Sequence, residues 1–64
     1  MPSYRFYLIV GSMIMEREET LCADDREAHD RADRRLRETG ARYDAIEAWD
    51  GVRRVCRIER SIIP

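Results

Sequence analysis

The sequence YDAIEAWDGVRRVCRI, residues 43–58, places an Asp-Gly dipeptide between two runs that suit extended backbone. Asp-Gly in that position is the strongest short-range sign of a two-residue β-hairpin. We therefore predict strands over 43–49 and 52–58, with the turn at Asp50-Gly51. The predicted register pairs Glu47 with Arg54 and Asp44 with Arg57, so that opposite charges face each other.

Both sides of this hairpin carry apolar residues, so the sequence leaves open which side meets the rest of the core. One side carries Ile46, Ala48 and Val55; the other carries Tyr43, Ala45, Trp49, Val52, Cys56 and Ile58.

A second hairpin is predicted near the start of the chain. Residues 4–10, YRFYLIV, are rich in aromatic and β-branched residues, and Gly11-Ser12 separates them from residues 13–18. A glycine-first pair is typical of a type II′ turn. The predicted partners are Val10 with Met13, Leu8 with Met15, Tyr7 with Glu16, and Arg5 with Glu18. One face then carries Phe6, Leu8, Val10, Met13 and Met15, and the other carries Arg5, Tyr7, Ile9, Ile14, Glu16 and Glu18.

Between the hairpins the chain predicts one helix, from about Asp25 to Thr39. Asp24 and Glu27 have the spacing of a capping box, in which the Asp24 side chain accepts hydrogen bonds from backbone N–H groups and the Glu27 side chain reaches back. Gly40 is a natural left-handed stop. The apolar stripe is narrow and mostly small, which lets the helix lie close to a sheet. It consists of Ala28, Ala32 and Leu36.

These elements predict an α+β fold in the order ββαββ. A right-handed crossover places the first strand between the second and the third, which gives a four-stranded antiparallel sheet of order 2-1-3-4 with one helix on one face. We assign residues 1–60 to this single domain and residues 61–64 to a C-terminal tail.

Three stretches, YRFYLIV, CADDREAHDRA and IEAWDGVRRV, resemble a group of small bacterial proteins of uncharacterised activity. These proteins share a hairpin-helix-hairpin plan and a Trp-Asp-Gly turn. The resemblance covers about residues 4–58. It implies the same fold and a bacterial cytoplasm, and it implies no activity.

Length and composition limit the classes of function. A chain of 64 residues with two cysteines is too poor in cysteine for a disulfide scaffold, so we expect Cys22 and Cys56 to be reduced thiols of a cytoplasmic protein. Thiol pairing cannot be read from a sequence, so a single Cys22–Cys56 bridge is the open alternative. The apolar run near the N-terminus is too short and too interrupted for a membrane span. Twelve arginines are balanced by thirteen acidic residues, for a net charge of −1.

The sequence gives little support for a catalytic site or a metal site. Asp25, His29 and Asp33 are spaced by one helical turn, and an imidazole with two carboxylates suits zinc, but structural zinc sites usually add cysteine or a second histidine. No histidine other than His29 is present to activate a hydroxyl or thiol. We therefore expect no enzyme, no metal and no cofactor.

A single helix covers one face of a four-stranded sheet, and the other face is half apolar. An exposed apolar face of this kind indicates an interface, and self-association suits so small a core. We expect a non-enzymatic protein-protein interaction or assembly module, acting as a homodimer or as a small accessory subunit. The expected interface residues are Tyr7, Ile9, Ile14, Trp49 and Val52.

The alternative is weak nucleic-acid binding by arginines of the last strand. Arg53, Arg54 and Arg57 cluster there, beside aromatic residues that could stack on bases. Backbone binding depends on uncompensated cations, whereas these arginines have acidic residues opposite them in the predicted register.

Overall fold

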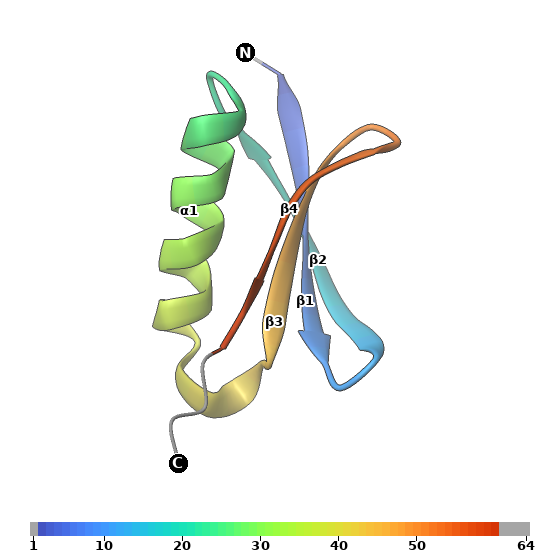
Figure 1. The fold of residues 1–64 in the computed structure, drawn as a ribbon, viewed down its shortest axis with the longest axis vertical. Helices are drawn as coiled ribbons and strands as arrows, with labels where there is room; N and C mark the ends of the chain where they lie inside the picture. The colour runs from blue at the N-terminus through green and yellow to red at the C-terminus, as the bar shows by residue number, and fades with distance from the viewer. Residues whose placement is uncertain (1, 61–64) are drawn as a thin grey trace.

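The computed structural model describes residues 2–60 and forms one four-stranded antiparallel sheet with one α-helix on one face (Figure 1). The predicted tail, residues 61–64, lies outside the described residues. The elements are β1 (Ser3–Val10), β2 (Met13–Leu21), α1 (Asp25–Glu38), the 3₁₀ turn η1 (Gly40–Arg42), β3 (Ala45–Asp50) and β4 (Arg53–Glu59). The strand order is β2-β1-β3-β4. The predicted fold class, element order and strand order are therefore confirmed.

The helix begins and ends as its sequence predicts. The Asp24 carboxylate accepts a hydrogen bond from the Glu27 N–H at 2.9 Å, and the Glu27 carboxylate accepts one from the Ala23 N–H at 2.7 Å. The first bond satisfies a backbone donor that the first turn leaves without a partner, and the second ties the residue before the N-cap to the helix. At the other end, the last helical residue is Glu38, Thr39 is the C-cap, and Gly40 leaves the helix with a φ of +63°.

The core lies between α1 and the helix-facing side of the sheet. The stripe predicted on the helix is buried: Ala28 and Ala32 are fully covered and Leu36 is 4% exposed. Because the alanine side chains are small, the helix can approach the strands closely. The helix then covers the large apolar side chains of the sheet, and their burial stabilises the fold. The sheet and its flanking loops contribute Tyr4, Phe6, Leu8, Cys22, Tyr43, Ile46 and Ala48, with Val55, Cys56 and Ile58 packed at the margin.

The register of the first hairpin differs from the prediction after its turn. Val10 does face Met13 across Gly11-Ser12, but the register then shifts by one residue between Leu8 and Ile9. Leu8 therefore faces Glu16 instead of Met15. The predicted Tyr7–Glu16 and Arg5–Glu18 pairs are wrong as well, and the observed partners are Tyr7 with Arg17 and Arg5 with Glu19.

A β-bulge has this effect because side chains alternate across a strand, so one extra residue moves every later side chain to the other face. Glu16 and Glu18 consequently lie on the helix-facing side of β2. Val10, Met13 and Met15, which were predicted on the core side, are exposed by 39%, 66% and 54%.

The second hairpin also contains a bulge, and its turn lies one residue later than predicted. Asp50 faces Arg53, so the two turn residues are Gly51 and Val52. Gly51 has a φ of +61°, and no non-glycine residue among those described has a positive φ, which is typical of a type II′ turn rather than the predicted type I′.

The predicted cross-strand pairs of this hairpin are therefore wrong. Glu47 faces Arg57 rather than Arg54, and the register shifts between Ala48 and Trp49. The shift also settles which side of the hairpin meets the helix. Cys56 faces Ala48 and Ile58 faces Ile46 on the core side, whereas Trp49 faces Arg54 on the other side.

Candidate protein-interaction surface

The face of the sheet opposite α1, here called the open face, carries side chains from all four strands. Figure 1 shows α1 on one side of the sheet that the two hairpins form, and no described helix or strand packs on the other side. Strand alternation assigns side chains to this face by register. They are Arg5, Tyr7 and Ile9 of β1, Ile14, Arg17 and Glu19 of β2, Ala45, Glu47 and Trp49 of β3, and Arg54, Arg57 and Glu59 of β4.

A shallow hollow of about 380 Å³ lies on the open face and unites most of the predicted interface residues. Tyr7 and Trp49 meet edge to face, with ring centroids 6.4 Å apart and planes at 81°. Ile14 is 56% exposed and Val52, in the turn, is 97% exposed. The lining consists of Tyr7, Ile14, Glu47, Trp49, Gly51 and Val52.

Ile9 departs from the prediction. It belongs to the open face by register, beside Ala45 and Ile14, yet it is only 4% exposed. A side chain that is already covered gains almost nothing from a further contact. Ile9 therefore belongs to the buried part of the chain and does not offer a contact surface.

Glu47 is the polar group of this hollow, and its importance was not predicted. Its carboxylate accepts hydrogen bonds from the Trp49 indole N–H at 3.0 Å and from Arg57 at 2.5 Å, and Arg54 lies 3.6 Å away. Burial alone would raise the pKa of Glu47, but these hydrogen bonds and positive charges outweigh it and lower the pKa. The carboxylate therefore stays ionised and holds the indole in place.

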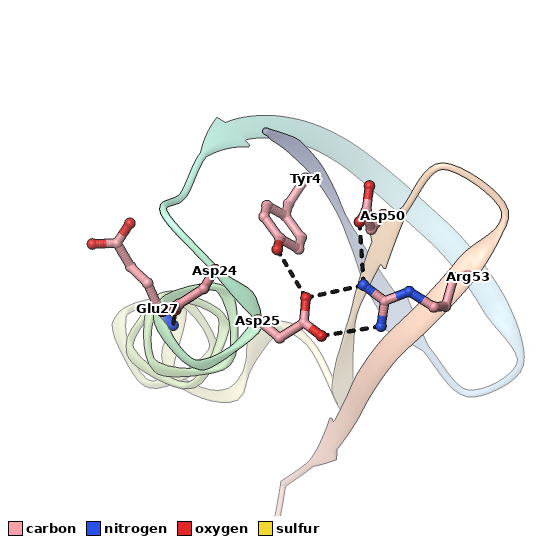
Figure 2. A network of polar contacts seen from close by, with 6 residues as sticks. All are labelled: Tyr4, Asp24, Asp25, Glu27, Asp50 and Arg53. Carbon is pink, nitrogen blue, oxygen red and sulfur yellow. Dashed lines mark hydrogen bonds and ion pairs between the residues drawn. The ribbon is translucent and has the colours of Figure 1, made fainter. Parts of the chain in front are cut away.

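Arg53, the first of the arginines considered for nucleic acid, points to the other side of the sheet and joins three elements. Its guanidinium donates two hydrogen bonds of 3.0 Å to the Asp25 carboxylate and a third, of 3.2 Å, to Asp50 (Figure 2). The Tyr4 hydroxyl donates to the same Asp25 at 2.8 Å. The network fixes the first turn of α1 against β1 and the second hairpin.

The charges of this network act on its titratable groups. Hydrogen bonds from Arg53 and Tyr4 lower the pKa of Asp25. The bond that the Tyr4 hydroxyl donates to Asp25, together with burial, raises the pKa of Tyr4 to about 12. The three-residue spacing from Asp50 to Arg53 across the turn was the one signal of this network in the sequence.

The three arginines do not form a common cationic surface. Arg53 contacts Asp25 and Asp50, Arg54 lies near Glu47, and Arg57 contacts Glu47 and Glu59. Each positive charge therefore has a carboxylate within 4 Å, whereas phosphate binding requires cations that are free to replace counterions.

Asp25, His29 and Asp33, which were considered as a zinc site, each have a different neighbour in the structure. Asp25 is held by Arg53, Asp33 pairs with Arg37 at 2.7 Å, and His29 is exposed beside Asp30 at 3.8 Å. Within residues 2–60, no three His, Cys, Asp or Glu side chains gather as a metal site would require.

The two cysteines are free thiols. Cys22 is fully buried, and burial raises its pKa above the ordinary value, which lowers the fraction of reactive thiolate. Burial also raises the pKa of Cys56 above the ordinary value.

In the part of the chain that the structure describes, no helix has the length and apolar character needed to cross a membrane. Comparison of the chain with protein-family models, with curated protein sequences and with solved structures gave no match, so the resemblance to small bacterial proteins stays a prediction.

Proposed function

We propose that this chain is a non-enzymatic assembly module whose open face binds a second copy of the same chain, giving a homodimer that acts by itself or as a small subunit of a larger complex. The observation that carries the proposal is the hollow formed by Tyr7, Ile14, Trp49 and Val52 on the face that α1 leaves uncovered.

The shape of this surface suits a two-fold contact. An isologous interface needs a projection and a recess on the same patch, because each copy supplies both. Val52 projects from the turn with 97% of its surface exposed, and the recess between Tyr7, Ile14 and Trp49 lies beside it. In a two-fold contact, Val52 of each copy can enter the recess of the other.

The charges around the patch also suit a second copy. Arginine and glutamate alternate on the open face, with Arg5, Arg17 and Arg57 near Glu19, Glu47 and Glu59. A mixed rim allows each arginine to find a carboxylate on a rotated copy, and the net charge of −1 produces little repulsion.

Burial of these side chains on association would add to the small free energy of folding that the core supplies. Complete burial of Val52 contributes about 2 kcal/mol and burial of the exposed half of Ile14 about 1 kcal/mol. A chain of this size often derives only about 3–5 kcal/mol from its own core, so such a gain is substantial.

Sedimentation velocity tests the proposal. We expect a dimer at tens of micromolar for the native chain, and a folded monomer for Val52→Arg and Ile14→Arg. Ala41→Arg, at an exposed position in η1 away from the open face, is the matched control and should remain a dimer. A native chain that sediments as a monomer, or a dimer that survives both open-face substitutions, would contradict the proposal.

A further inference from the structure

The exposed apolar surface of this chain is concentrated on one edge strand. Six large hydrophobic residues are exposed among those described, and four of them belong to β2. These four are Met13, Ile14, Met15 and Leu21, with exposures of 66%, 56%, 54% and 58%. In the described sheet β2 pairs only with β1, so its outer edge has free backbone donors and acceptors.

We propose that β2 pairs antiparallel with β2 of a second copy, forming a continuous eight-stranded sheet. This edge contact uses a different surface from the open-face contact and is the weaker of the two, so that in sedimentation at tens of micromolar only the open-face dimer is expected. An unpaired edge strand is a template for further strand pairing. The β-bulge near Met15 disturbs the first part of β2, so the regular part available for pairing is residues 16–21.

The charges of β2 select one register. A two-fold axis normal to the sheet keeps each side chain on its own face, so the axis must lie midway between two copies of the same residue. Any such axis sets one residue against its own copy, whether it lies at Arg17, at Glu18 or at Glu19. Within β2, only the axis at Glu18 also sets Arg17 opposite Glu19 of the other copy, twice, which is favourable.

The Glu18 register is also compatible with the rest of the fold. The two Glu18 carboxylates would meet near the axis, but each is already held by Arg35 through contacts of 2.6–3.2 Å. The helix packs on β3, β4 and β1, so β2 stays accessible from its outer side.

Cysteine cross-linking tests this register and detects weak association. Directly opposed residues of antiparallel strands have Cα atoms about 4.5–5.5 Å apart, which suits a disulfide. In a Cys56→Ala background, we expect Glu18→Cys to cross-link with itself. Arg17→Cys mixed with Glu19→Cys should give mainly the mixed dimer. Arg34→Cys, an exposed control on α1, should give only background cross-linking.

Charge reversal provides a second measurement. Arg17→Glu should reduce cross-linking at Glu18→Cys several-fold, and the double change Arg17→Glu with Glu19→Arg should restore it, while circular dichroism confirms that each variant is folded. Cross-linking that is equal at all positions, absent at Glu18→Cys, or insensitive to the reversal would overturn the proposal. Glu18 lies on the helix-facing side, so an open-face dimer alone cannot produce its cross-link.

Discussion

The ion pair between Arg35 and Glu18 links α1 to the edge strand β2, on which the helix does not otherwise pack extensively. The guanidinium donates three hydrogen bonds to the carboxylate: from Nε to Oε1 at 2.9 Å, from Nε to Oε2 at 3.2 Å, and from Nη2 to Oε2 at 2.6 Å. We expect this pair to stabilise the fold more than the other helix-surface ion pairs do.

The exposure of the two side chains sets the size of the effect. Charge-assisted hydrogen bonds contribute roughly 1.5–3 kcal/mol when protected from water, whereas exposed ion pairs contribute roughly 0.2–1 kcal/mol. The side chains of Arg35 and Glu18 are 37% and 31% exposed, between these limits. Discounting for solvent screening, we expect a coupling free energy of about 1 kcal/mol.

A double-mutant cycle measures this coupling. The variants are Glu18→Gln, Arg35→Met and their combination, and the measurement is urea unfolding followed by circular dichroism. The pair of Asp33 and Arg37 on the helix surface is the matched control, with one carboxylate 35% exposed and a guanidinium 79% exposed. Its coupling should be only about 0.3–0.5 kcal/mol, as for other pairs four residues apart on a helix.

The coupling should also depend on pH. The hydrogen bonds from Arg35 lower the pKa of Glu18 below its ordinary value. A carboxylate with a lowered folded-state pKa stabilises the fold above its unfolded-state pKa and loses that contribution as the pH falls through the folded-state pKa. The coupling should therefore be complete at pH 7 and vanish in acid. A coupling no larger than that of the control pair, or one that persists after Glu18 is protonated, would refute the reasoning.

Three further predictions follow from the core, the polar network and the arginines. Leu8→Ala removes a fully buried side chain from under the helix and should cost about 2–5 kcal/mol, enough to leave much of the chain unfolded by circular dichroism at 25 °C. Because Tyr4 has its pKa raised to about 12, absorbance titration should show its ionisation well after that of an ordinary tyrosine, and the fold should lose the contribution of its hydroxyl as the pH rises through that value. Because Arg53, Arg54 and Arg57 already contact carboxylates, labelled single- and double-stranded oligonucleotides should bind little even at low salt; tight binding that weakens steeply with salt would favour the nucleic-acid alternative.

The open face could be predicted from the sequence only in part. Tyr7, Ile14, Trp49 and Val52 gather around one hollow, as alternation along the strands indicated. Ile9 was assigned to the correct side but is covered by its own chain, because the exposure of a side chain depends on its neighbours in space. Glu47 was predicted only as a cross-strand ion pair, and its contact with the Trp49 indole depends on side-chain packing that no strand pattern encodes.

Local signals in the sequence determined the elements of this protein and their order. The capping residues Asp24 and Glu27 start the helix, Gly40 stops it, and Gly11 and Gly51 allow the two turns, because each acts within a few residues. The tertiary structure alone decided the registers. Each hairpin contains one bulge, and a shift of one residue reverses the faces of all residues beyond it. In β2 the shift moves Glu16 and Glu18 toward the helix side, where the Tyr43 hydroxyl and Arg35 bind them. Those partners lie 17 to 27 residues away along the chain, so the free energy that favours the bulge arises only once the helix has packed on the sheet.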